Sequence, residues 1–308
     1  MSQEVIFFGH IVLDTIVKGD KRWQSLGGTV VYGALTSLRF EAKPVVVSKV
    51  GEDFPDEYLI FLSRNGIDLS FVRMVRGTKT TRFKLTYKNA ERELTLQAKS
   101  EDITLFDVEL VDLGGKVAIV GPVIAEVTLD ALDSIRSRAA LTALDLQGYL
   151  RSAKPREPVK LARSDSAIKA LSKADVVHMD ENEARVLTGL EPKEAAAWVA
   201  SNGPKVALVT MGYSGAYIAS GGETIFIPAF EPDQVLDTTG TGDIFLTVFT
   251  LEYSRGAPLK TAAAMAAAAA SYRVERLGFD GLRDRWTVRN RAQKLLESLE
   301  YNSGTKTN

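Results

Sequence analysis

Short apolar runs alternate with amphipathic stretches along most of this chain, and this alternation constrains the fold more than any other feature. The runs are rich in β-branched residues and lie at 4–9, 43–51, 116–121, 140–148, 174–180 and 205–212. Continuous apolar runs are typical of strands in a parallel sheet, because helices cover both faces of such a sheet. The sequence therefore predicts a buried, mostly parallel sheet.

The stretches between these runs have helical character. They lie at 56–66, 126–138, 164–174 and 192–203, and the last has a proline near its start and a glycine at its end, as helices often do. Strands that alternate with helices favour a doubly wound α/β fold with right-handed crossovers. In such folds ligands bind at the carboxyl ends of the strands, so the loops after the strands are the candidate sites.

Size and composition limit the possible classes of protein. A chain of 308 residues with 45% hydrophobic content can bury a full core, and we expect a single domain over residues 1–308. The 38 basic and 39 acidic residues nearly cancel, which favours a small-molecule partner over a nucleic acid. The absence of cysteine excludes disulfides and thiolate catalysis. Without a run of 18 apolar residues or a signal-like start, we expect a cytoplasmic protein with no membrane partner.

One segment, residues 78–100, departs from the α/β pattern. Phe83, Leu85 and Tyr87 alternate with polar residues, and a second alternating run follows the turn-like "KNAE". This pattern predicts a half-exposed antiparallel hairpin. A hairpin inserted between α/β units would form a small sheet, used as a lid over the ligand, as the surface of a homodimer, or as both.

The loop "DTTGTGD", residues 237–243, runs directly into the apolar helical segment 244–256. Gly240 and Gly242 permit close backbone approach, and the free amides at a helix start would face an anion. Asp243 beside them would accept a proton from an attacking hydroxyl. The lysine of a P-loop is missing, and a simple turn with a helix-capping aspartate would explain the same residues.

Other segments decide between these alternatives, because "DTTGTGD" resembles the second signature of the ribokinase-like (PfkB) carbohydrate kinase family. Further segments resemble the motifs of that family in the same order: "GHIVLDTIV", "LGGTVVYGALTSLRF", "VSKVGEDFPDEYLIFLSRNGID", "MDENEARVLTG" and "VTMGYSGAYI". The matches run from about Val5 to Gly278. We therefore expect a ribokinase-like fold with a small β-sheet lid formed by about 12–27 and 78–100.

The resemblance implies transfer of the γ-phosphoryl of ATP to a hydroxyl of a sugar, polyol or nucleoside. It assigns the base to Asp243 and the anion hole to Gly240, Thr241 and Gly242. The resemblance also implies that the substrate contacts Asp14, Gly27, Gly28 and Tyr32. The nucleotide would contact Thr210, Gly212 and Gly215. Mg²⁺ would be held through water by Asp180 and Glu183. Judged without the family, Asp14 would be a strand-end cap, and Asp180 and Glu183 would compensate a helix dipole.

The chain departs from the family pattern at several positions. Asp180 stands where Asn is usual, Thr241 replaces Ala, and Thr247 and Val248 replace small residues. Tyr32 stands where sugar kinases often carry a substrate-contacting Asn, which argues against ribose or fructose 6-phosphate. The tyrosine would either pack inside the protein or stack on a ring of the substrate.

Three further residues have weaker signals. The segment "DLQGYLR", residues 145–151, is similar to a motif of myo-inositol kinases, in which Arg151 would either pair with a phosphate or be solvated. His178 lies in an apolar run and is interpreted as a core residue with satisfied hydrogen bonds, whereas His10 lies close enough to Asp14 to suggest a substrate contact.

The main hypothesis is an ATP- and Mg²⁺-dependent kinase of a sugar or polyol, with a lean toward a myo-inositol-like polyol. A nucleoside kinase of the same family is the alternative, which a stacking Tyr32 would suit. A non-catalytic sugar- or nucleotide-binding sensor is the alternative from another class. A dinucleotide-dependent dehydrogenase is disfavoured, because "GHIVLD" and not Gly-x-Gly-x-x-Gly follows the first strand.

Overall fold

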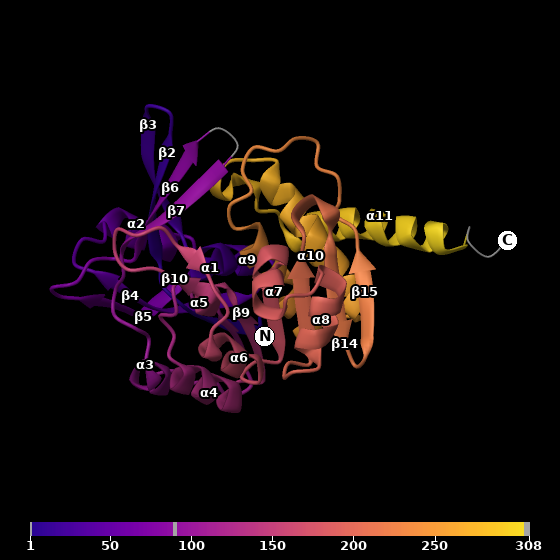
Figure 1. The fold of residues 1–308 in the computed structure, drawn as a ribbon, viewed down its shortest axis with the longest axis horizontal. Coiled ribbons are helices and arrows are strands. Elements are labelled where there is room, and N and C mark those ends of the chain that lie inside the picture. The colour runs from indigo at the N-terminus through magenta and orange to yellow at the C-terminus, as the bar shows by residue number, and fades with distance from the viewer. Residues whose placement is uncertain (1, 89–90, 305–308) are drawn as a thin grey trace.

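The computed structural model describes residues 2–88 and 91–304, and its centre is a large twisted sheet (Figure 1). Within these residues the sheet has nine strands in the order β15-β14-β13-β12-β9-β8-β1-β4-β5. From β13 to β5 neighbouring strands are parallel, whereas β14 is antiparallel to both of its neighbours, β13 and β15. The predicted doubly wound, mostly parallel sheet is confirmed.

Each of the six predicted apolar runs contains a strand. These strands are β1 (Glu4–Phe8), β4 (Lys43–Gly51), β8 (Val117–Val120), β9 (Leu141–Asp145), β12 (Val176–Asp180) and β13 (Val206–Thr210). The sequence analysis did not assign β5 (Asp68–Val75) or β15 (Glu223–Ile227), which lie at the two edges of the sheet, or β14 (Ala216–Ser220). Edge strands are covered less completely, so their apolar pattern is weaker.

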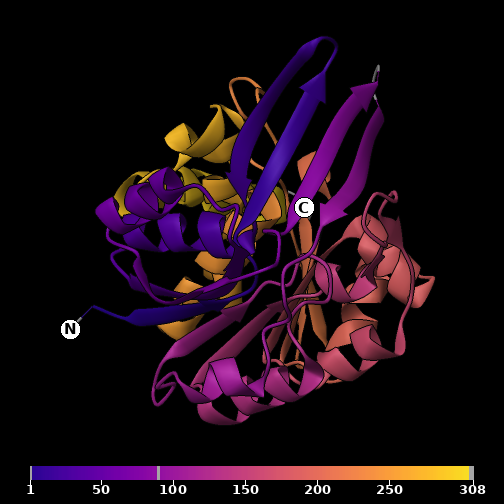
Figure 2. The same cartoon turned by 90° about the vertical axis from the view of Figure 1, so that its left-hand side faces the viewer.

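Helices cover both faces of the sheet, as Figure 2 shows. Alternate residues of β1 point into separate cores, with Val5 and Phe7 in one and Ile6 and Phe8 in the other. The first core is covered by α1 (Thr29–Arg39), α2 (Asp56–Arg64), α9 (Thr241–Ser254), α10 (Leu259–Val274) and α11 (Arg285–Gly304). The second is covered by α3 (Leu105–Glu109), α4 (Leu129–Arg138), α5 (Gln147–Leu150), α6 (Asp165–Leu171), α7 (Glu181–Thr188) and α8 (Pro192–Ala200).

A second sheet stands out from this body, and we call it the projecting sheet (Figure 2). In the described part of the chain it has four strands in the order β3-β2-β6-β7, namely β2 (Val12–Lys18), β3 (Lys21–Gly27), β6 (Arg82–Lys88) and β7 (Glu91–Ala98). The predicted hairpin is therefore present and pairs with the segment 12–27 that the family resemblance indicated. Residues 89–90 of the predicted turn lie outside the described residues. A two-stranded ribbon, β10 (Arg151–Ser152) and β11 (Lys160–Leu161), forms a separate small sheet, and the segment 156–159 between its strands is hydrogen-bonded to β7.

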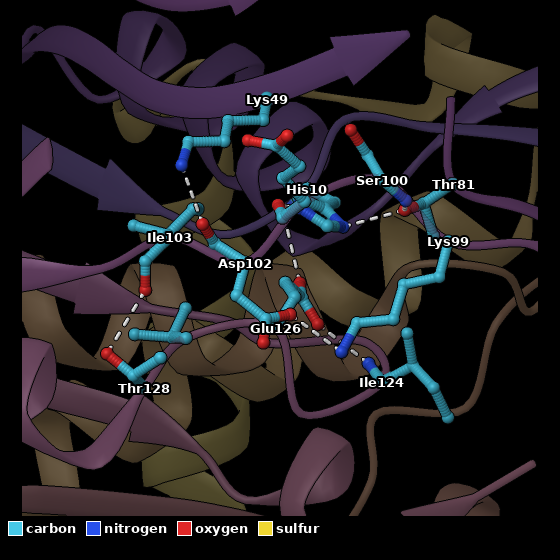
Figure 3. Close-up of polar contacts among 12 residues, drawn as sticks. His10, Lys49, Thr81, Lys99, Ser100, Asp102, Ile103, Ile124, Glu126 and Thr128 are labelled. Atoms are coloured by element: carbon cyan, nitrogen blue, oxygen red, sulfur yellow. Dashed lines mark hydrogen bonds and ion pairs between the residues drawn. The ribbon is translucent and has the colours of Figure 1, made fainter. Parts of the chain in front are cut away.

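The chain enters and leaves the projecting sheet through a buried polar cluster (Figure 3). His10 lies between β1 and β2, Thr81 directly before β6, and Ser100 shortly after β7. Nε2 of His10 lies 2.9 Å from the carbonyl oxygen of Glu101, so Nε2 carries the proton and Nδ1 accepts a hydrogen bond of 2.7 Å from the Thr81 hydroxyl. The amide of Ser100 donates to the same hydroxyl oxygen. These bonds join three of the four connections of the projecting sheet, and the fourth runs from β3 into α1.

His10 is completely buried in this cluster, and both of its ring nitrogens have protein partners. Burial is the main reason that the pKa of His10 lies below its ordinary value, so the ring is neutral. The interpretation of His10 as a substrate contact is therefore wrong, because the ring has no free face or nitrogen to offer. Glu126 supports the same region, since its carboxylate accepts the amides of His10, Val123 and Ile124.

Among the residues that the structure describes, no helix has the length and apolar character needed to span a bilayer.

Candidate active site

The carboxyl ends of β9, β12 and β13 and the N-termini of α1, α7 and α9 surround a cavity of about 360 Å³. Most of the residues that the sequence analysis assigned to a site line it: Asp14, Gly28, Tyr32, Asp180, Glu183, Thr210, Gly212, Gly240, Thr241, Gly242 and Asp243. Gly27 lies behind Asp14, where an added Cβ would be 2.8 Å from Oδ2 of Asp14. The predicted site thus forms one cavity at the expected edge of the sheet.

A second cavity, of about 140 Å³, adjoins the first. The two share Thr210, Gly212, Thr238, Thr241 and Gly242, and Gly215 lines the second one. Its other walls are largely apolar and come from Tyr213, Ala229, Phe230, Pro232, Phe245, Ala267, Ala270, Ser271 and Val274. A polar cavity and an apolar slot therefore meet at the loop 237–243.

Within the loop 237–243, Gly240 is the N-cap of α9, and its φ of 78° lies in the left-handed region. A Cβ at this position would also lie 2.5 Å from Cδ1 of Tyr32, so the loop requires glycine for two reasons. The first amides of an α-helix have no partner within the helix and carry the positive end of its dipole. The N-terminus of α9 is therefore suited to bind an anion in the cavity.

Tyr32 supports this loop from below. Its side chain is 3% exposed, its ring centroid lies 5.1 Å from that of Phe279, and burial raises its pKa to about 12, which keeps the phenol neutral. The ring rests against Gly240. This geometry favours the packing alternative for Tyr32 over stacking on a substrate ring.

The unusual Thr247 is accommodated inside α9. Its hydroxyl donates to the carbonyl oxygen of Asp243 at 2.7 Å, and Gly33 of α1 faces it, since an added Cβ on Gly33 would lie 2.9 Å from the Thr247 hydroxyl. Val248 beside it is fully buried. The larger residues Thr247 and Val248 therefore fit because α1 has a glycine, Gly33, where it approaches α9.

Asp243 lies in the first turn of α9 on the wall of the cavity. Burial and, after it, the negative charge of Asp145 raise the pKa of Asp243 to about 6. A hydrogen bond from Thr29 and the positive charges of His178 and Arg151 act in the opposite direction. A carboxylate with this pKa accepts a proton more readily than an ordinary aspartate and is still ionised at neutral pH.

A chain of hydrogen bonds crosses the floor of the cavity. Nδ1 of His178 lies 3.0 Å from Oδ2 of Asp145, and Nε2 lies 3.1 Å from the hydroxyl of Thr210. Burial opposes a charge on His178, but the carboxylate of Asp145 outweighs it and raises the pKa of His178. His178 is buried with satisfied hydrogen bonds, as predicted, yet it also lines the cavity next to Gly242.

The side of the cavity opposite the α9 loop combines polar and apolar groups. Asp14, Asp145, Gln147 and Arg151 supply the polar ones, and the side-chain amide of Gln147 donates to the hydroxyl of Thr29 at 3.4 Å. The apolar ones come from the underside of the projecting sheet and the loop after β8: Val12, Phe83, Leu85, Leu94 and Val123. A small polar molecule with an apolar ring face would match these walls.

Comparisons with known proteins identify the family. Residues 6–282 match the family described as pfkB family carbohydrate kinase. The chain belongs to this family. The cytidine kinase of Thermococcus kodakarensis is 30% identical over 266 residues, which cover 83% of this chain and 91% of that protein.

Two solved structures of the PfkB fold extend this likeness. The sulfate complex of a pyrophosphate-dependent kinase in the ribokinase family has a TM-score of 0.79 and 25% identity, covering 89% of this chain and 96% of that one. A pyrophosphate-dependent kinase of the ribokinase family complexed with a pyrophosphate analogue and myo-inositol also has a TM-score of 0.79, with 24% identity and 94% and 99% coverage.

Membership in the PfkB family decides between the classes of function that the sequence left open. The chain is a sugar or nucleoside kinase of the ribokinase type, a phosphotransferase with a hydroxyl group as acceptor, and kinases of this family use ATP as phosphoryl donor. This sets aside the non-catalytic sensor and the dehydrogenase.

The predicted magnesium ligands of this PfkB kinase begin α7. Oδ1 of Asp180 accepts the amide of Glu183 at 2.8 Å, and Oε2 of Glu183 accepts the amide of Asp180 at 3.0 Å, which is a capping box. Burial and the charges of Asp145 and Asp180 raise the pKa of Glu183 to about 7. The described residues contain no group of three or more His, Asp or Glu side chains close enough to hold a metal directly. The cavity holds more carboxylates than positive groups, which suits a hydrated Mg²⁺ whose remaining ligands would come from phosphates.

Proposed function

We propose that this chain is an ATP- and Mg²⁺-dependent kinase that phosphorylates a hydroxyl of a sugar or polyol. The observation that carries the proposal is the placement of Asp243, with its raised pKa, at the anion-binding N-terminus of α9, in the same cavity as Asp14 and Gly28. Base, anion hole and acceptor residues then converge on one point, as phosphoryl transfer requires.

In the proposed reaction Asp14 accepts a hydrogen bond from a hydroxyl of the acceptor and orients the molecule. Asp243 takes the proton of the reacting hydroxyl, whose oxygen forms a bond to the γ-phosphorus as the bond from that phosphorus to the bridging β–γ oxygen breaks. The amides of Gly240 and Gly242 stabilise the charge on the transferring phosphoryl group, and the amide of Thr241 joins them when its long bond of 3.4 Å to the carbonyl oxygen of Thr238 opens. The products are the phosphate ester and ADP.

Asp180 and Glu183 are the residues that would hold Mg²⁺ through water. The ion supplies positive charge that neutralises the phosphates, which the missing P-loop lysine cannot do. His178, held in place by Asp145, whose carboxylate raises the pKa of the ring, lies beside Gly242. These groups together replace the lysine.

The apolar cavity supports ATP as the donor. Its walls from Phe230, Phe245 and α10 suit a nucleobase, and it shares with the larger cavity the glycine loop that would hold the phosphates. A pyrophosphate donor, on which both structural neighbours described above depend, has no apolar part to place there.

For the acceptor we lean toward a myo-inositol-like polyol. Asp14, Asp145 and Arg151 offer charged groups to several hydroxyls at once, and Phe83 and Leu85 face them from the projecting sheet. Carboxylates select molecules with adjacent hydroxyls and discriminate against analogues that lack them. A nucleoside is the second candidate, favoured by the 30% identity to a cytidine kinase.

A panel of acceptors tests the proposal. We expect turnover with ATP, and a higher kcat/KM for myo-inositol or another sugar or polyol than for cytidine and other nucleosides. Each acceptor is measured with ATP and with pyrophosphate in separate reactions. A nucleoside at the top of the panel would favour the second candidate, and turnover with pyrophosphate alone would contradict the assignment of the donor.

We further propose that the projecting sheet, formed by residues 12–27 and 78–100, acts as a lid that closes over the acceptor. The support for this is that Val12, Phe83 and Leu85 line the cavity from this sheet, and that three of its four connections to the body meet at His10, Thr81 and Ser100. Closure would exclude water from the transferring phosphoryl group.

A further inference from the structure

Arg273, near the end of α10, has the largest fully buried side chain among the residues that the structure describes. A charged group removed from water is costly unless partners compensate it, so its contacts call for a functional or structural reason. Arg273 lines neither of the two cavities, and a ligand in either cavity would not touch it. Its partners belong to the loop that leads into α9.

The guanidinium binds three oxygens. Nη2 lies 2.6 Å from Oδ2 of Asp237, and Nη1 donates to the carbonyl oxygens of Asp237 at 3.3 Å and Arg276 at 2.8 Å. Burial acts to raise the pKa of Asp237, but the hydrogen bonds from Arg273 and the amide of Thr239 hold that pKa below its ordinary value. The carboxylate of Asp237 is therefore ionised at neutral pH.

Both ends of the loop are linked to this guanidinium, the first directly through Asp237 and the last through the ring of Tyr32. At its start, Asp237 uses its second oxygen, Oδ1, to accept the amide of Thr239 at 2.9 Å. At its end, Gly240 rests on the ring of Tyr32, and Cζ of Arg273 lies 5.6 Å from the centre of that ring. One buried cation thus contacts the residue that begins the loop and the residue that supports its last turn.

We propose that Arg273 is a positioning residue for phosphoryl transfer, which holds the loop 237–243 in the geometry that points the α9 amides and Asp243 into the cavity. This inference rests on the proposed function. An arginine suits the task because its planar fork reaches a carboxylate and two carbonyls in fixed directions, which a lysine ammonium cannot match. The segment before the loop has separate anchors, since the amide of Leu236 donates to the carbonyl of Val274 at 2.7 Å. Loss of Arg273 should therefore disturb the loop more than its surroundings.

The test replaces Arg273 by Met, which keeps length and apolar volume and removes the charge. For Arg273→Met we expect kcat to fall about 100-fold with little change in the KM of the acceptor, because misplacement of reacting groups by about 1 Å costs that much. Arg273→Lys should recover only part of the loss. The matched control is Arg285→Met, since Arg285 pairs with Glu252 at the opposite end of α9, with Nε 2.7 Å from Oε1. It should keep kcat near that of the wild type.

Two measurements separate positioning from a general loss of stability. In Arg273→Ala, millimolar guanidinium should restore activity, while urea, which has the same shape without the charge, should not. Hydrogen exchange of the amides of 238–243 should be faster in Arg273→Met than in the wild type, with no change in the central strands. This exchange needs no substrate, so it remains decisive even if the proposed kinase activity is not found. If Arg273→Met does not fold, Arg273→Lys is measured in the same way. Unchanged loop exchange or near-native kcat in a folded variant would overturn the inference.

Discussion

At the scale of single residues, the cavity is governed by the repulsion among its carboxylates. Asp145, Asp180, Glu183 and Asp243 gather in it, with His178 and Arg151 as the counter-charges. Burial and this repulsion raise the pKa of Asp243 to about 6 and that of Glu183 to about 7. A site of this kind holds a proton-accepting base near neutral pH and favours the binding of a cation.

The raised pKa of Asp243 predicts the pH dependence of the reaction. Asp243 must be ionised to accept a proton, so kcat/KM should rise as the pH increases through about 6 and level off above it. His178→Gln removes a positive charge that lowers the pKa of Asp243, and the rising limb should move to higher pH. Profiles of both proteins with the same acceptor measure this. A limb that stays in place, or moves to lower pH, would count against the assigned electrostatics.

Sequence motifs predicted Asp243, the glycine loop and Asp14, because these residues carry a recognisable spacing, although Asp14 lies inside β2 and not at a strand end. His178 was interpreted only as a core residue, since its neighbours in β12 are apolar. Its role in the cavity depends on the strand order β9-β12-β13, which brings Asp145 and Thr210 to its two sides. The sequence does not indicate a buried role for Arg273, because an arginine at the end of an alanine-rich helix usually reaches solvent. Non-local contacts of this kind leave no pattern along the chain.

At the scale of elements, the projecting sheet differs from the core in how it is held. Its strands join the body through the connections that contain His10, Thr81 and Ser100, which are linked by hydrogen bonds (Figure 3). Its apolar underside packs on Val123 and Ile124. Its strand β7 is also hydrogen-bonded to the segment 156–159, so a movement of the sheet as a unit would carry that segment with it or break these bonds.

Closure of this sheet should be visible in hydrogen exchange. With an acceptor and a non-hydrolysable ATP analogue both bound, we expect the amides of β2, β3, β6 and β7 to exchange more slowly, because closure would shield them. The acceptor alone should give a smaller effect. The strands β8 and β9, buried in the core, serve as the internal control. Equal exchange in these four strands with and without both ligands would argue that the sheet does not act as a lid.

Elements were predictable to different degrees for a physical reason. A strand covered on both faces is apolar throughout, so β1, β4, β8, β9, β12 and β13 were evident from the sequence. The edge strands β5 and β15 were not recognised, because partial exposure mixes polar and apolar residues. The pairing of 12–27 with the hairpin came from the family resemblance and not from periodicity.

At the scale of the whole molecule, the fold explains why the catalytic parts meet. Parallel strands end at one edge of the sheet, and residues as distant in sequence as Asp14 and Asp243 line one cavity there. The layer of α9 and α10 adds the anion-binding helix start on one side, and the projecting sheet adds the apolar wall on the other. The family identity and the geometry both support our proposal that phosphoryl transfer takes place at this edge.

The central claim is that Asp243 is the base of a phosphoryl transfer, and Asp243→Asn tests it most directly. With the best acceptor of the panel and saturating ATP, kcat should fall about 100- to 10,000-fold, because general-base catalysis contributes that much. The dissociation constant for ATP and the thermal midpoint should stay close to the wild-type values. Asp130→Asn, an exposed carboxylate in the first turn of α4, is the control and should leave kcat unchanged. A folded Asp243→Asn protein with near-native kcat would contradict the account.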